Sequence, residues 1–259
     1  MAATYLDAIV AHHRERAARD NRSLDELIER ARQCEPPRGF RSALAGVPHL
    51  AVIAEFKRRS PSKGDLNSSM DPVEMAGLYQ RGGASCLSVL TDEPHFGGSV
   101  ADLQSARGAC TLPVLRKDFT VDARDVCDAR IMGADCVLLI AAALSPGELS
   151  SFLEVARRVD IDALVEVHDE RELGMALQAG ASLVGVNQRD LVTFEVDHAR
   201  AVRMGSMIPD NCVKVAESGV RGRQDAVALR DAGYHAVLVG EHLVTSGDVA
   251  HAVTDLCVA

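Results

Sequence analysis

The feature that most constrains the fold is an alternation of short apolar runs with longer helical stretches, which continues from residue 50 to residue 257. The apolar runs have the length and composition of buried β-strands, and capping residues such as Asp71-Pro72 and Ser145-Pro146 open the stretches between them. We expect strands at 50–57, 84–90, 113–117, 135–140, 163–167, 182–187, 213–217 and 236–240. Eight strands alternating with eight helices predict a parallel sheet closed into a (β/α)8 TIM barrel.

An open doubly wound sheet is the competing architecture, since it also alternates strands and helices. Its nucleotide-binding members often carry a Gly-x-Gly-x-x-Gly turn after the first strand, and that turn is missing here. If the sheet is a barrel, residues 91–98 are expected to form a loop after its second strand.

The first 49 residues are expected to form a helical extension that packs on the barrel, and residues 50–259 form the catalytic (β/α)8 domain. Ser23-Leu-Asp-Glu26 is a capping-box pattern that opens a helix from Leu24 to about Arg32, and Pro36-Pro37 ends it. The extension can cover the lower end of the barrel or lie over its mouth, and the sequence does not choose between them.

Charge and composition exclude several classes of function. A net charge of −9 and the absence of tryptophan argue against nucleic acid as a partner. No apolar run is long enough to span a membrane, and the charged N-terminus does not resemble a signal peptide, so we expect a cytoplasmic protein. The seven cysteines form no Cys-x-x-Cys pair and the nine histidines show no ligand spacing, so neither a metal nor a cofactor is expected.

Charged residues follow the first apolar run. Glu55 and Lys57 are two residues apart and therefore lie on the same side of a strand. Charges at the end of a buried strand need each other, further charges or a ligand, because an unpaired buried charge costs several kcal/mol. Ser60, Pro61 and Gly64 then turn the chain into a loop.

Polar residues end the other strands as well, and each has an ordinary explanation when taken alone. Lys117 can be a solvated loop residue, Glu166 a helix cap and Asn187 a turn residue. Together with Glu55, Lys57, Glu217 and Ser218, however, they project toward one barrel mouth, which is where this fold places its active sites. Lysines and glutamates that perturb one another's pKa values suit general acid–base catalysis.

The loops after the seventh and eighth strands predict a phosphate site. Gly219 follows Glu217-Ser218, and Gly240 lies between Val239 and Glu241. Glycines there allow backbone N–H groups to approach a phosphate at the position usual for this fold, although glycines required only for turns remain the alternative. Glu241 would contribute its backbone N–H, because its carboxylate would repel the ligand.

Six ordered motifs in these segments resemble the indole-3-glycerol-phosphate synthase family. They are Glu-Phe-Lys-Arg-Arg-Ser-Pro-Ser-Lys-Gly (55–64), Ser-Val-Leu-Thr-Asp-Glu (88–93), Leu-Arg-Lys-Asp-Phe (115–119), Leu-Val-Glu-Val-His (164–168), Gly-Val-Asn-Gln-Arg-Asp-Leu (185–191) and Val-Ala-Glu-Ser-Gly-Val (215–220). The resemblance extends from about residue 50 to the end, in register with all eight strands, and a helical prefix is also usual in that family.

The resemblance implies a ring closure in tryptophan biosynthesis. The substrate, 1-(2-carboxyphenylamino)-1-deoxyribulose 5-phosphate, condenses through its ring carbon onto its own ketone and then loses CO₂ and water. By position, Lys117 corresponds to the general acid that protonates the ketone oxygen, and Glu166 to the acid–base partner in the dehydration. Lys57 corresponds to a lysine that contacts the phosphate and substrate oxygens and can share proton transfer. The residues implied to hold these groups and the substrate hydroxyls are Glu55, Asn187, Glu217 and Ser218.

Substrate recognition is implied in the same way. Arg189 matches a position that can meet the anthranilate carboxylate. The aromatic ring needs an apolar wall, which strand ends and adjoining loops can supply, although Leu138 and Ile140 can also be plain barrel core. The remaining residues expected to contact substrate are Ser60, Pro61, Phe96, Phe119, Leu138, Ile140, Leu191, Gly219, Leu238, Gly240 and Glu241. The family often has larger residues in the loop at 95–98, so the details of the ring pocket are expected to differ.

Two rival functions remain. Another phosphate-binding barrel enzyme, such as phosphoribosylanthranilate isomerase, would be expected to use a Cys/Asp pair where this chain has Lys and Glu. A non-catalytic descendant that binds a metabolite would be expected to lack Lys117 or Glu166, and both are present. The favoured partner is therefore a small phosphorylated substrate, and association with other tryptophan-pathway enzymes is compatible with it.

Overall fold

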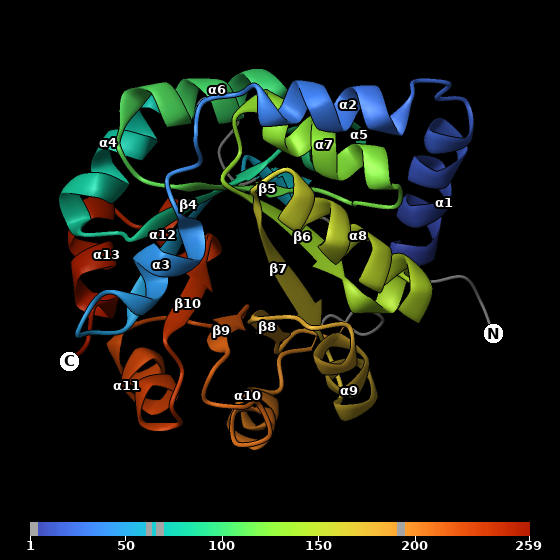
Figure 1. The fold of residues 1–259 in the computed structure, drawn as a ribbon. Helices are drawn as coiled ribbons and strands as arrows, with labels where there is room; N and C mark the ends of the chain where they lie inside the picture. Colours follow the sequence, from blue (N-terminus) through green and yellow to red (C-terminus); the bar gives the residue numbers. More distant parts are fainter. Residues whose placement is uncertain (1–4, 61–63, 66–69, 191–194) are drawn as a thin grey trace.

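The computed structural model describes residues 5–60, 64–65, 70–190 and 195–259. Parallel strands close into a barrel in the order β1-β10-β9-β8-β7-β6-β5-β4, which confirms the predicted fold (Figure 1). The barrel strands are β1 (Ala51–Phe56), β4 (Cys86–Leu90), β5 (Val114–Lys117), β6 (Cys136–Ile140), β7 (Asp162–Val167), β8 (Leu183–Asn187), β9 (Val213–Glu217) and β10 (Ala236–Val239).

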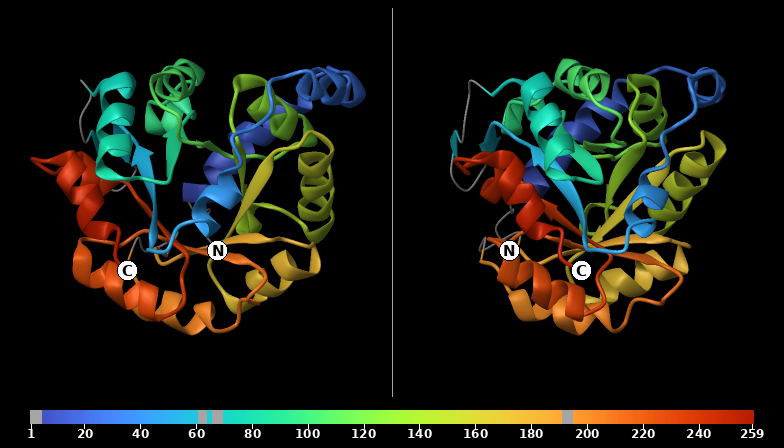
Figure 2. Two further views of the ribbon diagram at one scale, coloured as in Figure 1. Left: turned by 60° about the vertical axis from the view of Figure 1, so that its left-hand side comes forward. Right: turned by 90° about the vertical axis from the view of Figure 1, so that its left-hand side faces the viewer.

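A helix follows each barrel strand, and Figure 2 shows these helices as an outer layer around the sheet. They are α4 (Pro72–Gly82), α6 (Val100–Ala109), α7 (Ala123–Met132), α8 (Pro146–Arg158), α9 (Glu170–Gln178), α10 (His198–Gly205), α11 (Arg223–Asp231) and α13 (Val249–Leu256). Asp71 and Ser145 cap α4 and α8 through their side chains, as the sequence predicts. Among the described residues, no helix has the length and apolar character needed to cross a membrane.

Side chains alternate along the strands and so divide the core into two parts. Outward-facing residues such as Val52 and Ala54 belong to the large cluster between the sheet and the outer helices. Inward-facing residues such as Ile53, Leu115 and Leu164 fill the barrel interior as a second cluster. The interior is therefore packed, and only the polar strand ends are left to form a site.

The N-terminal segment contributes to both ends of the barrel. Its helices are α1 (Tyr5–Ala18), α2 (Leu24–Arg32) and α3 (Phe40–Ala45). Phe40 and Leu44 of α3 join the inner cluster, and the backbone N–H of Arg41 donates to Asp162 at the start of β7. Helix α2 packs on α7 and α8 at the outside, whereas α1 reaches the C-terminal end of the barrel. Helix α3 therefore packs into the barrel interior at the lower end and α1 reaches the mouth, so both placements that the sequence left open occur.

Five short elements of the barrel domain were not expected. The segment 91–98, predicted as a loop, contains helix α5 (Glu93–Phe96), because Asp92 caps its start by accepting from the backbone N–H of His95. The loop after β1 contains a two-stranded antiparallel sheet of β2 (Arg59–Ser60) and β3 (Gly64–Asp65). Helix α12 (Glu241–Val244) begins directly after Gly240, and a 3-10 turn η1 (Ala141–Ala143) follows β6.

Candidate functional site

A cavity of about 530 Å³ opens at the C-terminal ends of the barrel strands. Of the residues expected from the sequence, those that line it are Glu55, Lys57, Phe96, Lys117, Phe119, Leu138, Ile140, Glu166, Asn187, Arg189, Glu217, Ser218, Gly219, Leu238, Gly240 and Glu241. The predictions for Pro61 and Leu191 fall outside the described residues, and only the backbone of Ser60 is described. The structure thus brings together nearly all of the expected site.

The charges after the first strand pair with each other at one side of the cavity. Lys57 Nζ donates to Glu55 Oε1 over 2.6 Å, and Ser88 Oγ donates to the other carboxylate oxygen of Glu55 over 3.4 Å. Glu55 also lies against Gly240, where an added Cβ would fall 2.6 Å from Glu55 Oε1. Glu55 and Lys57 therefore form an ion pair with each other, and both also line the cavity.

Lys117, at the end of β5, is the centre of a buried charge cluster with Glu166 of β7 and Glu217 of β9. Its Nζ donates to Glu166 Oε2 over 2.9 Å and to Glu217 Oε2 over 2.8 Å. The side chains of the two glutamates are 4% and 2% exposed, and that of Lys117 is 16% exposed toward the cavity. One ammonium group therefore sits between two carboxylates, with an open side that a substrate oxygen can approach.

The environment sets the protonation of this cluster. Burial alone would lower the pKa of Lys117, but the charges of Glu166 and Glu217 outweigh it and raise that pKa. Burial raises the pKa of Glu217, and the negative charge of Glu166 raises it further. Burial acts in the same direction on Glu166, but Lys117 and His168 override it and hold the pKa of Glu166 below its ordinary value. Lys117 is therefore an ammonium, Glu166 a carboxylate, and Glu217 the member that takes up a proton first.

Glu166 is held by two further side chains. Asn187 Nδ2 donates to Glu166 Oε1 over 3.0 Å, and His168 Nε2 lies 3.4 Å from the same oxygen. His168 Nδ1 in turn lies 3.2 Å from Glu172 Oε2. Burial acts to lower the pKa of His168, but Glu172 and Glu166 raise it. His168 was missed in the sequence analysis, although its position two residues after Glu166 places it on the same side of the strand.

Two glycines make room for the carboxylates. An added Cβ at Gly185 would lie 2.0 Å from Glu217 Oε1, and Gly240 is restricted in the same way by Glu55. Gly240 was expected only for its backbone, and Gly185 was not expected at all. Gly185 lies two residues before Asn187 and so faces inward, a signal that was available in the sequence.

The loop after β9 has a strained backbone beside the cavity. Ser218 and Gly219 have φ values of +68° and +77°, and Gln188 Nε2 donates to the carbonyl of Ser218 over 2.8 Å. A left-handed conformation at a residue other than glycine costs of order 1–3 kcal/mol and often marks a functional loop. Gly240, at the start of α12, lines the same cavity. The two loops thus border one end of the cavity, where their N–H groups are candidates for binding an anion.

The other end of the cavity is apolar. Phe96 and Phe119 lie with their ring centroids 6.0 Å apart, and Leu138, Ile140 and Leu238 also line the cavity. Helix α1 adds Tyr5, Leu6 and Ile9 to the wall, which the sequence analysis did not assign to the site. The sequence shows that these three residues form a weak apolar stripe, but it does not show which surface the stripe packs on.

Solved structures of low sequence identity share the architecture. A 3-hexulose-6-phosphate synthase superposes with a TM-score of 0.64 at 15% identity, covering 82% of this chain and 100% of that chain. A thiamine phosphate pyrophosphorylase from Pyrococcus furiosus gives a TM-score of 0.59 at 17% identity, with 83% and 95% covered. These likenesses show the fold.

Sequence comparison identifies the family. The model of the indole-3-glycerol phosphate synthase family matches residues 6–256. An indole-3-glycerol phosphate synthase of Mycolicibacterium smegmatis is 51% identical over 99% of this chain and 95% of its own length. Indole-3-glycerol phosphate synthase 2 of Streptomyces coelicolor is 52% identical over 91% of this chain and 90% of its own. The chain therefore belongs to the indole-3-glycerol phosphate synthase family, the carboxy-lyases that close the indole ring in tryptophan biosynthesis.

Proposed function

We propose that Lys117 is the general acid of this ring closure and that the cavity binds 1-(2-carboxyphenylamino)-1-deoxyribulose 5-phosphate around it. The observation that carries the proposal is the position of Lys117 Nζ, hydrogen-bonded to both Glu166 and Glu217 at the floor of the cavity. The two carboxylates fix the ammonium in one place and leave its remaining side directed to the cavity, which is the preorganisation that acid catalysis requires.

The first step forms the new carbon–carbon bond. The ring carbon that bears the carboxylate attacks the ketone carbon, and the electron pair of the C=O bond moves to oxygen, which takes a proton from Lys117. A raised pKa of Lys117 does not prevent this transfer, because a developing alkoxide is about as basic as hydroxide and so a far stronger base than an amine. The ring then loses CO₂, and the bonding electrons restore its aromaticity.

The second step removes water. The hydroxyl formed from the ketone leaves with a proton from an acid, and a base takes a proton from the CH₂ group next to the nitrogen. We assign the base to Glu166, because the charges of Lys117 and His168 favour its carboxylate form. We assign the proton for the leaving oxygen to Lys57, whose hydrogen bond to Glu55 orients its ammonium group. The products are indole-3-glycerol phosphate, CO₂ and water.

Binding of the substrate follows from the two ends of the cavity. We assign the phosphate to the backbone N–H groups at Gly219 and Gly240, with Lys57 beside them. The aromatic ring is assigned to the apolar end, against Phe119, and its carboxylate to Arg189. The carboxylate of Glu241 cannot serve a dianion, so this residue contributes only its N–H.

The direct test uses the purified protein and the carboxyphenylamino substrate. Formation of indole-3-glycerol phosphate should appear as a fluorescence increase from its indole ring, with release of one equivalent of CO₂. Isomerisation of phosphoribosylanthranilate, or binding of the substrate without turnover, would contradict the proposal and favour one of the rival functions.

We further propose that residues 1–49 act as an extension of a catalytic domain formed by residues 50–259, because α1 supplies part of the cavity wall. The proposed reaction belongs in the cytoplasm, together with the other enzymes of tryptophan biosynthesis.

A further inference from the structure

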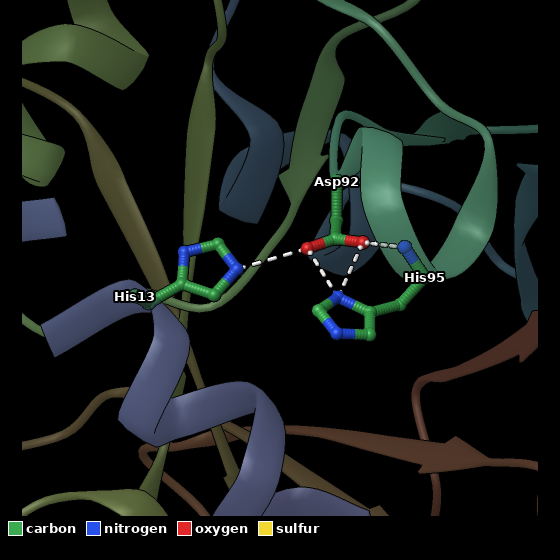
Figure 3. A group of neighbouring side chains, drawn as sticks. All are labelled: His13, Asp92 and His95. Atoms are coloured by element: carbon green, nitrogen blue, oxygen red, sulfur yellow. Dashed lines mark hydrogen bonds and ion pairs between the residues drawn. The ribbon is translucent and has the colours of Figure 1, made fainter. Parts of the chain in front are cut away.

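Three side chains outside the substrate cavity meet where the N-terminal extension touches the barrel. His13 comes from α1, Asp92 follows β4, and His95 lies on α5 (Figure 3). His13 Nε2 lies 2.9 Å from Asp92 Oδ2, and His95 Nδ1 lies 3.1 and 3.2 Å from the two oxygens of Asp92. One carboxylate is thus placed between two imidazoles from different parts of the chain.

The donor atoms form a compact set. One ligand atom from each of these residues lies within 4.8 Å of the other two. Tetrahedral ligands about 2.0–2.2 Å from a zinc ion are roughly 3.3–3.6 Å from one another, so the observed nitrogen–oxygen separations are already close to that spacing. The two imidazole nitrogens need to approach each other by at most roughly 1.5 Å to complete it.

The surroundings also suit an ion. His13 and Asp92 are each 2% exposed, so a bound ion would be shielded on most sides, whereas the His95 side chain is 23% exposed and leaves an entry from solvent. Asp118 Oδ1 lies 3.9 Å from His13 Nε2 and adds a second negative charge at outer distance. The site therefore offers two imidazole nitrogens, one carboxylate ligand and an open side.

The tautomer of His13 can change to accept an ion. In the metal-free arrangement Nε2 carries the proton that it donates to Asp92. Nδ1 of His13 is buried and has no hydrogen-bond partner among the described residues, and in Figure 3 it points away from Asp92. Nε2 can become a ligand when the proton moves to Nδ1, at the cost of a buried N–H that has no acceptor among the described residues.

We propose that His13, Asp92 and His95 bind one divalent transition-metal ion, for which Zn²⁺ has the best-suited chemistry. Imidazole nitrogens select Zn²⁺, Co²⁺ or Ni²⁺ over Mg²⁺ and Ca²⁺, which prefer oxygen ligands. The His13 and His95 nitrogens coordinate as neutral donors, Asp92 supplies one or both oxygens, and water completes the sphere at the exposed side. None of the three residues lines the substrate cavity, so the ion has a structural role and not a catalytic one.

The consequence of binding is a tether between the extension and the barrel. The His13 ring packs on Phe119, with centroids 5.4 Å apart, and Phe119 lines the apolar end of the cavity. Helix α1 supplies Tyr5 and Ile9 to the same wall. A bound ion therefore holds that wall in place and is expected to stabilise the folded chain.

The test is titration of the metal-free protein with ZnSO₄ by calorimetry, together with the unfolding temperature measured with and without Zn²⁺. We expect one ion per chain and a rise in the unfolding temperature. His95→Asn removes a ligand at a partly exposed position, so the variant should fold normally. Its affinity for Zn²⁺ should fall by about 10²-fold or more, because losing even a residue that only supports a ligand costs up to about that much. Asp92→Asn retains a helix-capping side chain and should also weaken binding.

Matched controls separate this site from other donors. His251→Asn disrupts a surface His–Asp pair, with His251 Nε2 3.5 Å from Asp255, and should leave the affinity unchanged. The titration is repeated in a Cys34→Ser, Cys257→Ser background, because these two cysteines are partly exposed. Co²⁺ in place of Zn²⁺ should give visible absorption without a sulfur-to-metal charge-transfer band.

The results that would overturn the proposal are equally definite. Absence of a one-to-one complex at millimolar Zn²⁺ would show that the cluster is only a hydrogen-bonded contact. Equal affinity in wild type and His95→Asn, or loss of binding in the serine background, would place the ion elsewhere.

Discussion

The strongest prediction concerns Lys117, because the structure gives it two roles that can be separated. Lys117→Met keeps most of the side-chain volume but removes the ammonium from between Glu166 and Glu217. Glu217 is then buried without its cation, and Glu166 keeps only the neighbouring His168. Breaking a buried ion pair by removing one partner costs about 3–5 kcal/mol. Loss of the positioned acid should reduce turnover by roughly 10²-fold or more, equivalent to about 2.7 kcal/mol of transition-state stabilisation.

A second variant distinguishes the two effects. Adding Glu217→Gln to Lys117→Met removes one of the stranded charges and should recover a substantial part of the lost stability. Turnover should remain low, because no group has replaced the proton donor. Glu217→Gln alone serves as the reference, and substrate binding should change far less than turnover in Lys117→Met, since the phosphate and ring contacts are retained.

The assay combines steady-state kinetics by indole fluorescence with urea unfolding of the same preparations. Recovery of near-normal turnover in the double variant would show that Lys117 only balances charge. Near-normal turnover in Lys117→Met itself would move the acid role to Lys57.

Three further predictions use other parts of the site. Gly185→Ala should destabilise the protein by about 1–3 kcal/mol through overpacking against Glu217, and it should also lower turnover. The control Gly174→Ala, which has open space inside helix α9, should instead stabilise the protein by up to about 1 kcal/mol. Urea unfolding measures both free energies. His168→Asn should destabilise the protein most at low pH, because the pKa of His168 is raised in the folded state. Its contribution to stability is complete below the ordinary pKa of 6.5 and is lost as the pH rises through the raised value. A stability difference that stays constant across pH would contradict this. Inorganic phosphate should inhibit competitively and occupy the loops after β9 and β10 in crystals, and density on another face would contradict the assignment.

Much of the fold could be predicted because its signals are local. Buried strand runs and capping residues such as Asp71 and Ser145 mark each element within a few residues. The closing of the sheet follows from counting the repeats, since eight βα units form a barrel. Short elements such as α5 were missed, because a single turn held by one capping aspartate has no periodicity to detect.

The positions of the charged strand ends could also be predicted, because strands alternate their faces and this barrel places its strand ends together. The protonation states could not, since they depend on distances between residues far apart in sequence, as between Lys117 and Glu217. The role of Gly185 has the same origin: only the structure shows which side chain occupies the space that a Cβ would need.

The seam of the barrel joins the first strand to the last, with Ala51–Ala54 of β1 paired to Ala236–Val239 of β10. Glu55 is the second-last residue of β1 and Gly240 directly follows β10, so residues from opposite ends of the barrel sequence meet here. During synthesis, Lys57 and Glu55 are made early, whereas Gly240, which lies against Glu55, is made close to the end of the chain. Contacts of such long sequence separation form late because their closure entropy must be met first. Enzymatic activity therefore requires that the whole sheet has closed, and a partly folded chain whose final strand has not paired is expected to be inactive.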